Sequence, residues 1–190
     1  ISDARKLFDK GNSIGLNMYL LDIGGGFPGS LEDSSVTFPE MAQTINQAIE
    51  QYFSDLKNVK VIAEPGRYFA TKSHTLVFNV VGKRKYMNED GTPCFLYYMN
   101  DGIYGSFNCI KFDAANPKII PVLRKGEECF KATFFGPTCD SVDTMFKEID
   151  MSELSIGEWC FVEHFGAYTR ASASNFNGFK PPKCVYIMHF

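Results

Sequence analysis

Apolar residues recur at helical spacing in two segments near the start of the chain, residues 2–11 and 37–53. In the second segment, Thr37 and Glu40 have the spacing of a capping box, which favours a helix start at this point. Each helical segment is followed by a short apolar run that predicts a buried strand, at residues 18–23 and at residues 60–67, where the strand ends in a turn. Helix, strand, helix and strand in this order are typical of a parallel α/β unit.

From about residue 68 onward, β-branched and aromatic runs are separated by turn residues, which is typical of a mostly-β domain. We expect one helical stretch in this part, at residues 139–149. The runs that we expect to form strands are residues 74–87, 93–105, 128–137, 158–168 and 183–190. The pattern therefore predicts an α/β unit in residues 1–67 and a β-domain in residues 68–190.

The chain has 190 residues, a formal net charge of −3 and a pI of about 5.6. This small negative net charge does not fit a basic nucleic-acid-binding surface. No apolar run is long enough to span a bilayer. The opening, ISDARKLFDKGNS, is charged and amphipathic, unlike a secretory signal, and a start at Ile1 in place of Met suggests a fragment. We expect a cytoplasmic protein that binds neither nucleic acid nor membrane.

None of the six cysteines has the C-x-x-C spacing of a zinc site or a redox pair. His74, His164 and His189 share no spacing that is typical of metal ligands. We therefore expect reduced thiols, as in the cytosol, and no metal site.

Three consecutive glycines, Gly24 to Gly26, follow the first predicted strand, and the sequence EPGR, residues 64–67, follows the second. Glycine loses the most backbone freedom on folding, so three in a row suggest that something approaches the backbone closely. Backbone N–H groups and an arginine suit a phosphate, and the loops after strands 7 and 8 of a (β/α)8 barrel often form such a site. Glu64 would suit the pyridinium nitrogen of pyridoxal phosphate (PLP). The alternatives are a tight turn in which glycine merely fits and a surface carboxylate.

Five motifs occur in an order that resembles the eukaryotic ornithine decarboxylases: LLDIGGGFPGS, IAEPGRY, YYMNDGIYGSFNC, FGPTCDSVD, and GAYT with SASNFNGF. That family belongs to the fold-type III, PLP-dependent decarboxylases of basic amino acids. The resemblance covers the whole chain. It implies that residues 1–67 are the last strands and helices of a PLP-binding (β/α)8 TIM barrel, and that residues 68–190 are a C-terminal, mostly-β, barrel-like domain. The cofactor-binding lysine of the family lies in a motif that no lysine here matches, so we expect the chain alone to be inactive.

The resemblance also implies roles for individual residues. Cys139, in GPTCD, resembles the thiol that returns a proton to Cα after CO₂ leaves. The residues implied to bind PLP are Gly24, Gly25, Gly26, Glu64, Pro65, Gly66, Arg67 and Tyr168, and those implied to bind the substrate are Phe112, Asp113, Asp140 and Phe176. Phe112 stands where the family often has tyrosine. Asp143 resembles a residue of an intersubunit ion pair.

These residue types fit the chemistry, although each has a plainer interpretation. Carboxylates can bind the distal ammonium of a diamino acid. A substrate that lacks this ammonium would leave the carboxylates unpaired, which disfavours its binding. A cysteine can be a mildly acidic, partly shielded proton donor. Without the resemblance, Cys139 is a small core residue, Asp140 caps a helix that starts at Ser141, and Asp143 is a solvated charge on that helix.

The implied activity is PLP-dependent decarboxylation of L-ornithine to putrescine, the first step of polyamine biosynthesis. It would take place in a homodimer with shared active sites, with antizyme as a further partner. Two alternatives stay open: an inactive, antizyme-inhibitor-like regulator of the same fold, and a decarboxylase of lysine, arginine or diaminopimelate. One methylene of substrate length is worth only about 1–3 kcal/mol in selectivity, so small changes could retune the site.

Overall fold

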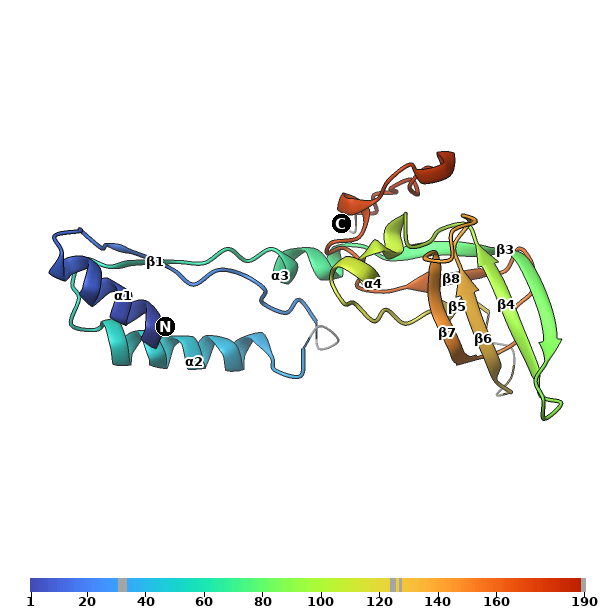
Figure 1. Ribbon diagram of the computed structural model, residues 1–190, viewed down its shortest axis with the longest axis horizontal. Coiled ribbons are helices and arrows are strands. Elements are labelled where there is room, and N and C mark those ends of the chain that lie inside the picture. Colours follow the sequence, from blue (N-terminus) through green and yellow to red (C-terminus); the bar gives the residue numbers. More distant parts are fainter. Residues whose placement is uncertain (31–33, 124–125, 127, 189–190) are drawn as a thin grey trace. The chain divides into compact units, whose positions relative to one another are not determined.

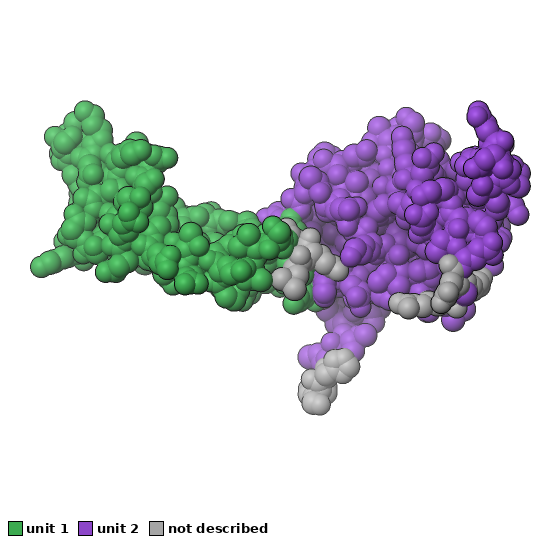
Figure 2. Space-filling model, turned by 90° about the horizontal axis from the view of Figure 1, so that it is seen from below, with its two compact units in different colours: residues 1–72 green, residues 73–190 purple. Residues whose placement is uncertain are grey.

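The computed structural model describes residues 1–30, 34–123, 126 and 128–188. The chain divides into two compact units, Ile1–Lys72 and Ser73–Phe190, which Figure 2 colours separately. The boundary between the units falls after Lys72, a few residues beyond the expected change of pattern at residue 68. We call Ile1–Lys72 unit 1 and Ser73–Phe190 unit 2.

Unit 1 consists of α1 (Ser2–Ser13), β1 (Leu20–Asp22), α2 (Phe38–Phe53), β2 (Lys60–Ile62) and α3 (Arg67–Ala70). The strands pair in parallel, with Leu21 opposite Val61. Phe8, Leu21 and Phe53 form its buried core, and the rings of Phe8 and Phe53 meet edge to face with centroids 5.2 Å apart. The predicted order of helix, strand, helix and strand is confirmed.

The start of α2 has the capping box that the sequence predicts. The N–H of Glu40 donates to Oγ1 of Thr37 at 3.4 Å, and the N–H of Thr37 donates to Oε2 of Glu40 at 2.8 Å. The hydrogen bond from the Thr37 hydroxyl, followed by the bond from its N–H, lowers the pKa of Glu40. Two residues three positions apart thus satisfy backbone donors that would otherwise be unpaired at the start of the helix.

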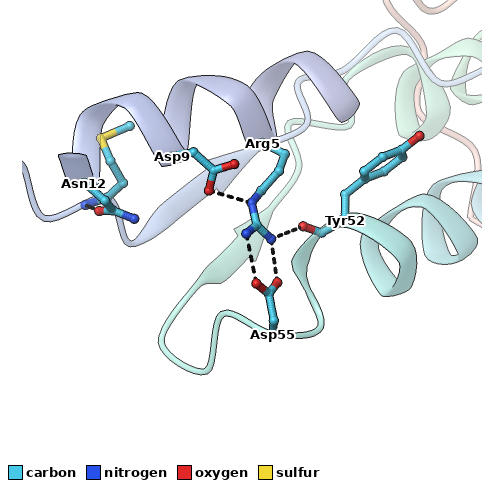
Figure 3. A network of polar contacts seen from close by, with 6 residues as sticks. Arg5, Asp9, Asn12, Tyr52 and Asp55 are labelled. Atoms are coloured by element: carbon cyan, nitrogen blue, oxygen red, sulfur yellow. Dashed lines mark hydrogen bonds and ion pairs between the residues drawn. The ribbon is translucent and has the colours of Figure 1, made fainter.

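Arg5 connects α1 to the residues that follow α2 (Figure 3). Its Nε donates to Oδ1 of Asp9 at 2.8 Å, and its two terminal nitrogens contact Oδ1 and Oδ2 of Asp55 at 2.5 and 2.9 Å. Nη1 also donates to the carbonyl of Tyr52 at 2.5 Å. The hydrogen bond from Arg5 lowers the pKa of Asp55, so this carboxylate is ionised at neutral pH. Because a two-pronged arginine–carboxylate contact is geometrically specific, it fixes how α1 lies against the end of α2.

In its described residues, unit 2 is built on a six-stranded sheet in the order β5-β8-β3-β4-β6-β7 (Figure 1). Only β4 and β6 are parallel among these neighbours. The strands and the helix are β3 (Leu76–Met87), β4 (Pro93–Met99), α4 (Cys109–Phe112), β5 (Ile120–Pro121), β6 (Phe130–Phe135), β7 (Thr144–Met151) and β8 (Trp159–Val162). The 3₁₀ helices of the chain are η1 (Thr71–Ser73), η2 (Ser106–Asn108), η3 (Arg170–Ser172) and η4 (Phe176–Gly178).

Aromatic side chains fill the core of unit 2. The buried rings include Phe78, Phe95, Tyr97, Phe107 and Phe134. The predictions of strands within residues 74–87, 93–105, 128–137 and 158–168 are confirmed, because each of these segments contains one strand of the sheet.

The expected helix at residues 139–149 is wrong, because most of this segment belongs to strand β7. β7 pairs antiparallel with β6, and the register of the pair shifts twice. At each shift β7 carries an extra residue, as in a β-bulge, and Glu148 has a left-handed φ of 52°. Extra residues interrupt the alternation of a strand, which leaves apolar residues at the spacing of a helix, at Val142, Met145, Phe146 and Ile149.

The expected strand at residues 183–190 is also wrong over its described part. Residues 183–188 form no strand, and the side chains of Val185, Tyr186, Ile187 and Met188 are exposed by 74–86%. β-branched and aromatic residues form a strand only beside a neighbour that accepts and donates hydrogen bonds. Residues 189–190, and with them His189, lie outside the described residues.

Two negative findings hold for the part of the chain that the structure describes. None of its helices is both long enough and apolar enough to cross a membrane. No three His, Cys, Asp or Glu side chains in it gather as metal ligands.

Candidate functional site

The glycine run and the EPGR segment meet at the carboxyl ends of β1 and β2. The N–H of Glu64 donates to the carbonyl of Gly24 at 2.7 Å, and the N–H of Gly24 donates to Oδ1 of Asp22 at 2.8 Å. Gly24 and Gly26 have φ values of 70° and 79°, in the left-handed region that favours glycine. A Cβ at Gly25 would collide with the carbonyl oxygen of Glu64. The three glycines therefore allow a tight turn to press against the loop of the neighbouring strand.

The same turn leaves backbone donors for a ligand. The N–H groups of Gly25 and Gly26 have no acceptor among the described residues. The space that a Cβ of Gly24 or Gly26 would enter is open. Arg67 lies half-buried as the first residue of α3, directly after Gly66. Backbone N–H groups together with a guanidinium can hold a phosphate.

The residues after the glycine run lie directly on α3. A Cβ at Gly29 would come within 2.8 Å of the carbonyl oxygen of Arg67 and 2.6 Å of Cβ of the buried Thr71. Glu64 is exposed and Pro65 is half-buried in the loop that leads to α3. The structure therefore brings the predicted residues of unit 1 together in two adjoining loops.

In unit 2, Tyr104 holds the carboxylate of Asp140. The Tyr104 hydroxyl donates to Oδ2 of Asp140, and the N–H of Val142 donates to Oδ1 at 2.9 Å. The hydrogen bond from Tyr104, followed by that from Val142, lowers the pKa of Asp140. The ring of Tyr104 stacks on Phe176 with centroids 4.2 Å apart. Asp140 is thus an ionised, half-buried carboxylate beside two aromatic rings, and the alternative that it caps a helix is wrong.

Cys139 lies at the edge of the same group. Its Sγ is 3.8 Å from Nδ2 of Asn177, the residue that follows Phe176. The thiol is exposed, so the alternative that Cys139 is a small core residue is wrong. Two motifs that are 38 positions apart in the sequence therefore meet at this thiol.

Asp143 joins the loop that carries Tyr104 to the loop that carries Cys139. Its side chain is 1% exposed. Oδ1 accepts from the N–H of Ile103 at 2.7 Å, and Oδ2 accepts from the N–H and the hydroxyl of Thr138 at 3.0 and 2.7 Å. The plainer interpretation of Asp143, a solvated charge on a helix, is therefore wrong, because its carboxylate is buried and accepts hydrogen bonds within unit 2.

Asp101 shapes the other end of the Tyr104 loop. Its Oδ1 accepts from the N–H groups of Gly102 and Ser106 at 2.8 and 2.9 Å. Burial raises the pKa of Asp101, against the hydrogen bonds from Ser106 and Gly102, which lower it. Its Oδ2 is buried without a partner among the described residues. Asp101 lines a cavity of about 20 Å³ together with Tyr104 and Phe176.

Tyr168 lies in the GAYT loop, with its side chain 54% exposed and a left-handed φ of 55°. The carbonyl of the next residue, Thr169, accepts from Nδ2 of the buried Asn108 at 2.5 Å. The same Nδ2 donates to the carbonyl of Gly105 at 2.6 Å. Asn108 thereby ties the GAYT loop to the loop that carries Tyr104.

Phe112 and Asp113 lie at the end of α4. Phe112 is 80% exposed, and Asp113 is exposed as well. The structure thus groups Cys139, Asp140 and Phe176, and Phe112 and Asp113 project into solvent at the end of a short helix. Sequence reasoning missed the supporting residues Tyr104, Asp101 and Asn108, although all three belong to the motif YYMNDGIYGSFNC.

Comparisons with known sequences match this chain to pyridoxal-dependent decarboxylases and their relatives. Residues 1–71 match the family model described as the pyridoxal binding domain of pyridoxal-dependent decarboxylases. The ornithine decarboxylase of Cricetulus griseus is 44% identical over 198 residues, which cover 99% of this chain and 43% of that protein. Antizyme inhibitor 2 of Xenopus laevis is 42% identical over 199 residues, with the same two coverages of 99% and 43%.

Among solved structures, decarboxylases of basic amino acids are similar to this chain as well. The arginine decarboxylase of Paramecium bursaria Chlorella virus, bound to agmatine, is 32% identical and matches with a TM-score of 0.81. This match covers 94% of this chain and 47% of that one. The chain therefore spans less than half the length of the relatives that it matches.

Proposed function

The chain belongs to the family of pyridoxal-dependent decarboxylases that includes the ornithine decarboxylases, and on that premise we propose that the complete protein converts L-ornithine to putrescine and CO₂ with PLP. This reaction is the first step of polyamine biosynthesis. The observation that carries the proposal is the pairing of Tyr104 with Asp140, which presents an ionised carboxylate beside the thiol of Cys139.

The surroundings of Asp140 suit the distal ammonium of a diamino acid. The carboxylate is ionised at neutral pH, and the hydrogen bonds that lower its pKa keep it ionised in more acidic solution as well. The rings of Tyr104 and Phe176 stack beside it and offer an apolar surface to a methylene chain. A substrate without a distal cation would leave the carboxylate unpaired, which disfavours its binding. We propose Asp140, Phe176, Phe112 and Asp113 as the substrate-binding residues.

The residues of unit 1 fit PLP. The N–H groups of Gly25 and Gly26 and the guanidinium of Arg67 would hold the phosphate, with the hydroxyl of Tyr168 as a further donor. Glu64 would bind the ring nitrogen and keep it protonated. Bound PLP supplies an electron sink for the electrons that remain at Cα when CO₂ departs.

Cys139 would deliver the proton that completes the reaction. After CO₂ leaves, Cα requires one proton, and an S–H group within reach can donate it and regain a proton from solvent. The exposure of Cys139 permits this exchange with solvent. Asn177, whose Nδ2 lies 3.8 Å from Sγ, would orient the thiol.

The assembly that we propose is a cytoplasmic homodimer with two shared sites. The proposed cofactor residues of unit 1 come from one protomer, and the thiol and the carboxylates come from the β-domain of its partner. The division of these two groups between separate units of the chain supports this arrangement. Antizyme is a further proposed partner.

The similarity to antizyme inhibitor 2 favours a second candidate function, a regulator that binds antizyme without catalysis. A regulator has no need of a proton donor, a substrate carboxylate or a phosphate-binding arginine. The chain retains Cys139, Asp140 and Arg67, so catalysis is the preferred proposal. A decarboxylase of lysine, arginine or diaminopimelate would use the same residue types.

Release of labelled CO₂ from carboxyl-labelled L-ornithine by the complete protein with PLP tests the proposal. We expect turnover of ornithine, and about 10–200-fold lower kcat/KM for lysine, which is one methylene longer. Asp140→Asn should raise KM for ornithine, whereas Asp150→Asn, which removes a surface ion pair with Lys131, should not. Binding of antizyme without CO₂ release from any basic amino acid would establish the regulator instead.

A further inference from the structure

A second, larger cavity of unit 2 adjoins the candidate site at Ser106 and Thr169, but none of the residues proposed for cofactor, substrate or catalysis lines it. Its volume is about 580 Å³, and neither Tyr104, Cys139 nor Tyr168 lines it. This volume falls in the range of about 300–1,000 Å³ that is usual for small-molecule sites. We call it the basic cavity, after the side chains of His74, Arg170 and Lys183 in its wall.

The charge of this wall is opposite to that of the chain. No Asp or Glu is present among the described residues that line the basic cavity, although the net charge of the chain is −3. A smaller adjoining cavity is also lined by His74 and Arg170 and has no acidic residue in its described wall. Cations gathered without counter-charges favour an anion at this position.

Arg170 has donors to spare. Its Nη1 donates to Sγ of Cys184 at 2.5 Å, and sulfur is a weak acceptor. No carboxylate pairs with Arg170 among the residues that the structure describes. A guanidinium has five N–H donors in a fork that matches a carboxylate, so most of its binding capacity is available to a ligand.

The rest of the wall is apolar. Leu76 and Phe165 are 8% and 7% exposed and contribute buried side chains, and Val185 and Ile187 add aliphatic groups. Such a mixture of apolar surface with a few converging polar groups is typical of small-molecule sites. An inorganic ion would use only the basic part of this wall, whereas an anion with an apolar body would use both parts.

We propose that the basic cavity binds a small amphipathic anion, a medium-chain carboxylate, whose head is held by Arg170 and whose tail contacts Leu76 and Phe165. Lys183 adds positive charge near the head, and the imidazole of His74 is a further polar group of the same wall. This site is separate from the residues proposed for decarboxylation, and its test does not depend on them.

Octanoate is the probe, and the thiol of Cys184 is the local reporter in the complete protein. Iodoacetamide is uncharged and should alkylate Cys184 in the wall of the empty cavity. Octanoate at about ten times its Kd should slow this alkylation about tenfold, as measured by mass spectrometry. Cys129, an exposed thiol that does not line the cavity, serves as the internal control and should react at an unchanged rate.

Charge recognition is tested by a matched pair of variants. Arg170→Gln should weaken octanoate binding about tenfold in calorimetry, the loss expected for one charge-assisted hydrogen bond. Lys118→Gln removes the same charge from an exposed residue outside the wall and should leave the affinity unchanged. If Arg170→Gln fails to fold, charge recognition can be tested on the unmodified protein with 1-octanol, which has the same chain but no charge. 1-Octanol should protect Cys184 from alkylation far less than octanoate does.

Equal protection by octanoate and 1-octanol would overturn the proposal, because the cavity would then recognise apolar surface alone. A Cys184 that is unreactive before any ligand is added would also overturn it, because another segment of the protein would then fill the cavity.

Discussion

The hydroxyl of Tyr104 donates a hydrogen bond to the carboxylate of Asp140 across 36 positions of sequence. The residue before Tyr104 donates its N–H to the buried Asp143, which also accepts two bonds from Thr138, the residue before Cys139. The two loops of the candidate site in unit 2 are therefore held together twice, once at the half-buried carboxylate of Asp140 and once in the interior, at Asp143.

Tyr104→Phe should change the pH dependence of substrate binding. The lost hydrogen bond stabilises the ionised form of Asp140, so the pKa of Asp140 should rise toward its ordinary value in the variant. Asp140 would then take up a proton at higher pH, and KM for ornithine should start to increase at a higher pH as the solution is acidified. The measurement is KM against pH.

Tyr98→Phe is the matched control, because Tyr98 stacks on Phe135 and lies on β4, outside the Asp140 group. If KM begins to rise at the same pH in Tyr104→Phe and in the unmodified protein, the proposed effect of Tyr104 on the pKa of Asp140 is contradicted.

Asp143→Ala should destabilise unit 2. It removes the acceptor of three hydrogen bonds from Ile103 and Thr138 and leaves their donors buried. We expect the free energy of unfolding, measured with urea, to fall by about 3 kcal/mol. Asp150→Ala, which removes an exposed partner of Lys131, should cost less than about 1 kcal/mol. Similar losses in both variants would show that the Asp143 carboxylate has no special structural role.

Arg67→Ala and Glu64→Ala should affect the complete protein differently. Arg67→Ala would remove the two-pronged contact to phosphate that we propose and should weaken PLP binding, which a fluorescence titration measures. Glu64→Ala should lower kcat, because the ring of PLP would lose its proton and its capacity to accept electrons. Full turnover by Glu64→Ala at saturating PLP would refute the role of Glu64.

Shared sites predict recovery of activity in mixed dimers. A Cys139→Ala chain and a chain without the cofactor-binding lysine should each be inactive alone. After subunit exchange, random pairing makes half of the dimers mixed, and each mixed dimer has one intact site of two, so activity should recover to about a quarter of the unmodified level. No recovery would mean that Cys139 serves the cofactor of its own protomer or has a structural role.

Local sequence patterns were sufficient for most elements of the fold. The capping pair Thr37 and Glu40 and the apolar spacing of residues 2–11 predict α1 and α2, because both signals act within one or two helical turns. The motifs also named Cys139, Asp140 and Phe176 for one site, and the structure places these three residues in one group of unit 2. This assignment came from the resemblance, since nothing in their spacing requires the three side chains to meet.

Local sequence patterns thus set the order of the elements and the residue types that are available for chemistry. That residues 144–151 form a strand follows from tertiary contacts, because pairing with β6 satisfies the backbone of this segment and two bulges mask its alternating pattern. The burial of Asp143 and the close contact of Gly25 with Glu64 also follow from tertiary contacts. The last two outcomes depend on contacts between segments about 40 positions apart, such as Asp143 with Ile103. Local periodicity carries no information about which distant segments will pack together.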